Sequence, residues 1–73
     1  MAANDQCAEK LRLVLEYTKA STDFTDAITT LSSKMGTSSR EQFEALRRAV
    51  DDRRLVMEQA RLNLDRHVAD HAC

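Results

Sequence analysis

Four residues of types that bind metal ions lie near the two ends of the sequence: Cys7, His67, His71 and Cys73. His67 and His71 are four residues apart, which on a helix places two imidazoles on one face where both can bind the same ion. Two cysteine thiolates would complete a tetrahedral Cys2His2 zinc site that joins the ends of a small domain. The sequence has no C-x2-C pair, so this spacing does not define a zinc site alone.

The same residues allow three other readings. Cys7 and Cys73 could form a disulfide, or both thiols could be free while the histidines interact favourably with a helix C-terminus. A Cys7–His67 pair is also the beginning of a nucleophilic site, but nothing in the sequence supplies an orienting third group, an oxyanion hole or room for a substrate pocket. We therefore expect no catalytic residues, and no cofactor unless zinc is bound.

The chain ends in ARLNLDRHVADHAC, residues 60–73. This segment resembles the tails of short, uncharacterised bacterial helical proteins that finish in a similar His-x3-His-x-Cys pattern. The resemblance is confined to these residues, and it implies no activity.

The stretch that would bring the two ends together is Met-Gly-Thr-Ser-Ser, residues 35–39. Gly36 is the only glycine of a chain without proline, and glycine readily adopts the left-handed conformation that ends a helix. A capping box can start the next helix, formed either by Ser38 with Glu41 or by Ser39 with Gln42. We therefore predict a helix over residues 4–35, a turn at 36–38 and a second helix over 39–71, which places residue 7 beside residue 67.

Apolar residues spaced by threes and fours predict the contact between these helices. The first seam comprises Leu13, Tyr17, Ala20, Phe24, Ala27 and Leu31, and the second comprises Phe43, Leu46, Val50, Arg53, Met57, Ala60, Leu64, His67 and His71. The fold class is thus all-α, a single domain (1–73) formed by an antiparallel, coiled-coil-like hairpin. The hydroxyl-rich stretch from 18 to 33 is expected to stay helical, with a break near residues 21–23 as the alternative. Arg53 should extend its charged end to water, with Asp23 as the alternative partner.

Charge excludes some classes of function. Eleven basic and twelve acidic residues give a net charge of −1. A row of four arginines on the second helix has an acidic residue four positions after each arginine, so we expect a solvated ion-pair ladder and no nucleic-acid binding: Arg40, Arg47, Arg54 and Arg61. No apolar run is long enough to span a membrane and no signal peptide is evident, so we expect a cytoplasmic protein without membrane contact.

Four leucines lie outside the seams: Leu11, Leu15, Leu55 and Leu62. They are level with one another across the hairpin, and we expect them to form a second apolar face near its open end. The simplest use of such a face is self-association into a twofold dimer with a four-helix bundle, and another helical protein is the alternative partner. The sequence therefore predicts a non-enzymatic structural or protein-interaction module, with a zinc-stapled domain as the alternative function.

Overall fold

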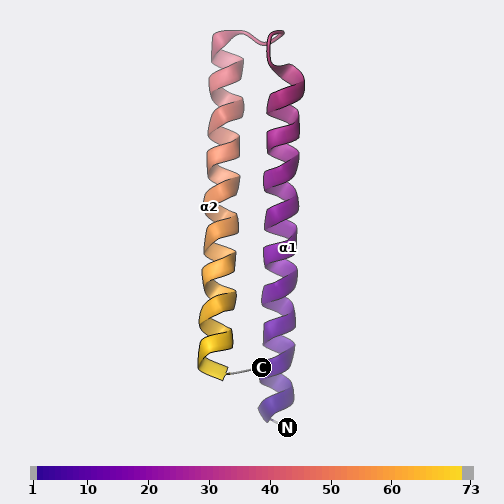
Figure 1. Ribbon diagram of the computed structural model, residues 1–73, viewed down its shortest axis with the longest axis vertical. Coiled ribbons are helices and arrows are strands. Elements are labelled where there is room, and N and C mark those ends of the chain that lie inside the picture. Colours follow the sequence, from indigo (N-terminus) through magenta and orange to yellow (C-terminus); the bar gives the residue numbers. More distant parts are fainter. Residues whose placement is uncertain (1, 72–73) are drawn as a thin grey trace.

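A computed structural model gives the backbone of residues 2–71 and the side chains of residues 8–70. Two helices, α1 (Ala2–Lys34) and α2 (Arg40–His71), pack against each other along their length. They run in opposite directions and are joined at one end by a short turn (Figure 1). The hairpin measures 55 × 15 × 11 Å. The prediction of an all-helical hairpin is confirmed.

α1 is one continuous helix, so the alternative break near residues 21–23 does not occur. Two threonines in the hydroxyl-rich stretch donate hydrogen bonds to carbonyl oxygens one turn earlier: Thr18 to Val14 (2.8 Å) and Thr22 to Thr18 (3.0 Å). These bonds satisfy two of the hydroxyl donors without interrupting the helix.

The turn has the backbone conformation and the capping hydrogen bonds that its residues favour. Gly36 adopts a left-handed conformation with φ of 86°. Ser39 and Gln42 form the reciprocal capping box, in which the Gln42 amide N–H donates to the Ser39 hydroxyl (3.1 Å) and the Ser39 N–H donates to the Gln42 side chain (3.0 Å). The Ser38 hydroxyl instead donates to the Lys34 carbonyl at the end of α1 (2.8 Å). One serine thus caps each helix, and α2 begins one residue after its cap.

Replacing Gly36 with alanine is expected to destabilise the hairpin by about 1–2 kcal/mol, the cost of a left-handed conformation for a residue with a Cβ. An added Cβ would meet no atom within 4 Å, so the whole effect comes from the backbone angle. Urea denaturation followed by circular dichroism measures the change. Gly36→Asn is the matched control and should lose less, because asparagine tolerates this conformation better than alanine. Equal stability of Gly36→Ala and the parent chain would contradict the prediction.

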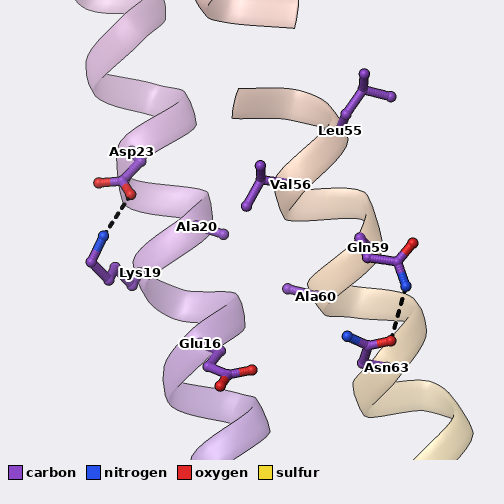
Figure 2. A pocket seen from close by; sticks show the side chains of 9 residues that line it. All are labelled: Glu16, Lys19, Ala20, Asp23, Leu55, Val56, Gln59, Ala60 and Asn63. Atoms are coloured by element: carbon purple, nitrogen blue, oxygen red, sulfur yellow. Dashed lines mark hydrogen bonds and ion pairs between the residues drawn. The ribbon is translucent and has the colours of Figure 1, made fainter. Parts of the chain in front are cut away.

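The core is a single seam between the helices. Leu13, Ala20 and Ala60 are its buried apolar residues, and among residues 8–70 no large side chain is fully buried. Ala20 and Ala60 point toward each other from the two helices (Figure 2), and their small size permits a close approach. The larger seam residues, such as Phe24 and Met57, are only half-buried because no third element covers the seam. The predicted seam is therefore correct apart from Arg53, which is exposed, and His71, whose side chain lies outside the described residues. It leaves much apolar surface uncovered.

Candidate association surfaces

The four leucines outside the seam are exposed to a similar extent: Leu11 60%, Leu15 61%, Leu55 58% and Leu62 54%. At about 100° per residue, Leu11 and Leu15 lie roughly 160° from the seam of α1, on the side that faces away from α2. Leu55 and Leu62 lie directly opposite the seam of α2 by the same count. Figure 2 shows Leu55 pointing away from α1.

The leucines therefore occupy two opposite outer faces of the hairpin, and the expectation of one shared apolar face is not met within a single chain. By helical spacing each pair projects from the far side of its own helix, and Leu55 also borders the groove that Ala20 lines. Residues that are level along two packed helices share a surface only if both lie on the same flank of the seam. Here both pairs lie opposite the seam, so the thickness of two helices separates them.

The hairpin exposes more surface than a compact chain of its mass. Its accessible surface is 5575 Å² for 8.3 kDa. A folded monomer of this mass is expected to expose about 4,600 Å², which leaves an excess of about 1,000 Å². That excess is comparable to the roughly 800 Å² that each partner contributes to a standard protein interface.

A groove runs along one flank of the hairpin (Figure 2), with a volume of about 520 Å³. Its apolar part is formed by Ala20 of α1 and by Leu55, Val56 and Ala60 of α2. The α1 rim carries an ion pair between Lys19 and Asp23 (2.9 Å), and the α2 rim carries a hydrogen bond from Gln59 to Asn63 (2.9 Å). The polar side chains of the rim thus bind one another, and the apolar part suits packing.

Val56 was not among the predicted interface residues, although it is 56% exposed. The signal that could have found it is the row beside the seam, in which Ala49, Val56 and Asn63 follow at seven-residue spacing without a charge. In a two-stranded coiled coil such positions are often Glu or Lys. The uncharged row makes this flank of α2 less polar than that of a typical two-stranded coiled coil.

Three of the four arginines in the row on the other flank of α2 are paired as predicted, and Arg47 makes no ion pair within the described residues. Arg40 contacts Glu44 (3.3 Å) and Arg61 contacts Asp65 (3.7 Å). Arg54 lies 4.0 Å from both Asp51 and Glu58. All these side chains are exposed, so each pair contributes only tenths of a kcal/mol, but together they offset the positive charge of the row.

Arg53 is exposed despite its seam position, and Asp23, its alternative partner, pairs with Lys19 instead. The expectation that its charged end reaches water is therefore confirmed.

The open end brings the beginning of α1 beside the end of α2, as predicted. Glu9 is close enough to His67 for the histidine charge to help lower the pKa of Glu9. The larger cause is a hydrogen bond from Arg12, whose Nε lies 3.0 Å from Glu9 Oε2. Arg12 also contacts Glu16. Its two carboxylate partners, Glu9 and Glu16, raise the pKa of the Arg12 guanidinium above its ordinary value.

Replacing Arg12 with glutamine is expected to return the pKa of Glu9 toward the ordinary value of a glutamate, because the main hydrogen bond to its carboxylate is lost. A lowered folded-state pKa stabilises the hairpin above the unfolded pKa, and this contribution disappears as the pH falls through the folded value. The variant should therefore lose less stability than the parent on acidification. Carboxyl carbon NMR titration of Glu9 measures the shift, with Lys19→Gln as control. An unchanged Glu9 pKa in Arg12→Gln would exclude this cause.

The predicted metal ligands are only partly within the described side chains. His67 is half-buried on the seam. Cys7 and His71 lie in α1 and α2, but their side chains are outside the described range, and Cys73 is outside it altogether. Within the described residues, no three His, Cys, Asp or Glu side chains are grouped as metal ligands. The Cys2His2 arrangement therefore stays a prediction.

The fold places the chain in the class of antiparallel helical hairpins, here with exposed leucines on both helices. Neither helix, over the residues described, is long and apolar enough to cross a membrane. No protein-family model, curated protein or solved structure matches the chain, so its function must be inferred from its own residues.

Proposed function

We propose that this protein is a small non-enzymatic module that acts by self-association of its hairpin, most simply as a cytoplasmic twofold dimer with four helices. The observation that carries the proposal is the surface: four exposed leucines on a hairpin whose accessible area exceeds that of a compact monomer by about 1,000 Å². A chain of this size often gains stability from oligomerisation because its own core is small.

The positions of the leucines limit how such a dimer forms. In a twofold contact each copy contributes the same patch. Leu11 and Leu15 lie on one outer face and Leu55 and Leu62 on the other, so one twofold contact covers only one pair. The remaining pair is then available to a further helical protein. The neutralised arginine row supports a protein partner over nucleic acid.

Sedimentation equilibrium tests the proposal on the unmodified chain. We expect a mass of twice 8.3 kDa at concentrations of tens of micromolar, with reversible dissociation on dilution. A mass of 8.3 kDa throughout that range would show that the hairpin is stable alone, and the proposal would then be wrong.

A zinc-stapled domain is the second candidate, and the proximity of Glu9 and His67 supports it by placing the first turns of α1 beside the last turns of α2. Cys7, His67, His71 and Cys73 would be the ligands. Protein purified without chelator is expected to contain one zinc per chain, and EDTA should lower its melting temperature. Less than a tenth of an equivalent of zinc, with no effect of EDTA, would rule this function out.

A further inference from the structure

The outer face of α2 carries a stripe of seven residues spaced by threes and fours: Arg48, Asp52, Leu55, Gln59, Leu62, Arg66 and Asp70. At about 100° per residue these positions fall within roughly 80° of one another, opposite the seam. All seven are exposed. We call them the outer stripe of α2.

The outer stripe complements itself when it is read backwards. Its order is basic, acidic, leucine, glutamine, leucine, basic, acidic. If a second stripe lies antiparallel with the two Gln59 residues level, Arg48 is level with Asp70 of the second copy and Asp52 is level with its Arg66. Leu55 then lies within one residue, about 1.5 Å along the axis, of the level of Leu62. A twofold axis at Gln59 repeats each of these contacts.

We infer that two copies of this chain associate through their outer stripes, in an antiparallel α2–α2 contact centred on Gln59. The inference rests on the proposed self-association and specifies its surface, direction and register. The two leucine pairs form the apolar centre, and two ion pairs on each side of it fix the register. The helices then lie in the order α1–α2–α2–α1, so the four-helix assembly is a layer in which the two α1 helices are outermost.

The charges of the outer stripe are available for such contacts. Arg48, Asp52, Arg66 and Asp70 make no ion pair within the described part of the hairpin, although Arg48–Asp52 and Arg66–Asp70 have the four-residue spacing that pairs Arg40 with Glu44 and Arg61 with Asp65. Asp52 and Arg66 are 14 residues apart, about 21 Å along one helix, so they can pair only between copies.

The outer face of α1 lacks these features. Beyond Leu11 and Leu15 it continues with Thr18, Thr22, Thr25 and Thr29, and the charged residue beside these threonines is Asp26. A face with acidic charge and no basic partner for it can pack, but it has no complementary ion pairs to specify direction or register. The outer stripe of α2 is therefore the surface whose charges can specify how two copies associate.

Charge reversal tests the register. At low ionic strength, Asp52→Arg is expected to raise the dimer Kd at least tenfold, because the introduced guanidinium would face Arg66 of the other copy twice in each dimer. Adding Arg66→Asp reverses both partners and should restore the Kd to within about threefold of the parent value. Rescue between residues about 21 Å apart in one chain requires contact between chains. Sedimentation velocity measures each Kd, and circular dichroism checks that helix content is unchanged.

Cross-linking tests the axis independently of charge. Gln59→Cys, in a chain with Cys7→Ser and Cys73→Ser, should be joined efficiently by a short bismaleimide, because a residue on the axis faces itself. Arg61→Cys in the same background is the matched control and should not cross-link, because Arg61 lies on a flank of α2.

A parent chain that dimerises, with no rescue by the double variant and no preference for Gln59→Cys, would overturn this contact and leave self-association intact. A monomeric parent would overturn both.

Discussion

The double variant Leu55→Glu with Leu62→Glu is expected to be monomeric, with a dimer Kd raised at least 100-fold over the parent. Burying a fully exposed leucine side chain contributes about 1.5–3 kcal/mol, and about half of that is available here because each side chain is already nearly half covered. Four leucines leave the interface of each dimer, and the carboxylates that replace them face one another. Sedimentation velocity over a hundredfold range of concentration measures the change. The hairpin should remain helical, since both positions lie opposite its seam.

The matched comparison is Leu11→Glu with Leu15→Glu, which makes the same chemical change at two leucines of the same exposure on the outer face of α1. We expect these variants to remain dimeric. The opposite outcome, with the α1 pair required and the α2 pair dispensable, would place the twofold contact on α1. If neither pair matters, the contact lies elsewhere, and Val56, an exposed residue of the groove that neither variant changes, becomes the next position to substitute.

Local chemistry made the turn predictable from sequence. Gly36 and Ser39 determine the conformation and hydrogen bonds of the backbone next to them. The sequence contains no other glycine and no proline that could compete as a turn. The choice between Ser38 and Ser39 as the cap was not predictable, because both have a suitable residue three positions later. Ser38 is engaged by the Lys34 carbonyl, which depends on the exact geometry at the end of α1.

The seam was predictable because the apolar period is sustained over both helices, whereas the location of the remaining apolar surface required more than periodicity. Leu11 and Leu55 were correctly expected outside the seam, and both are exposed. The four leucines are level along the hairpin axis, which is why one shared face was expected. Their helical spacing, however, places the two pairs on opposite sides of the hairpin. The groove at Val56 was missed for a related reason, since it depends on how closely Ala20 and Ala60 let the helices approach.

Leu13→Ala is expected to have the largest effect on the stability of the hairpin itself, a loss of about 2–3 kcal/mol. Leu13 is only 7% exposed and is the one large residue among the three most buried apolar positions of residues 8–70. The loss should be near the lower end of the range for buried leucines, because a seam that is open on both flanks lets neighbouring side chains move into the space. For a chain of this size, about 4–8 °C of melting temperature is lost per kcal/mol, so a fall of roughly 10–20 °C is expected.

Leu11→Ala separates burial from every other consequence of this substitution, because it makes the same change two residues away in the same helix at a side chain that is 60% exposed. The gain in helix propensity on replacing leucine with alanine is common to both variants and cancels in the comparison. Thermal unfolding should be compared at one fixed chain concentration, since dimerisation makes the melting temperature depend on concentration. We expect Leu11→Ala to change stability by less than about 0.5 kcal/mol. Equal losses in the two variants would mean that Leu11 is as buried in solution as Leu13, and the face of α1 that points away from α2 would then have to be covered by another chain.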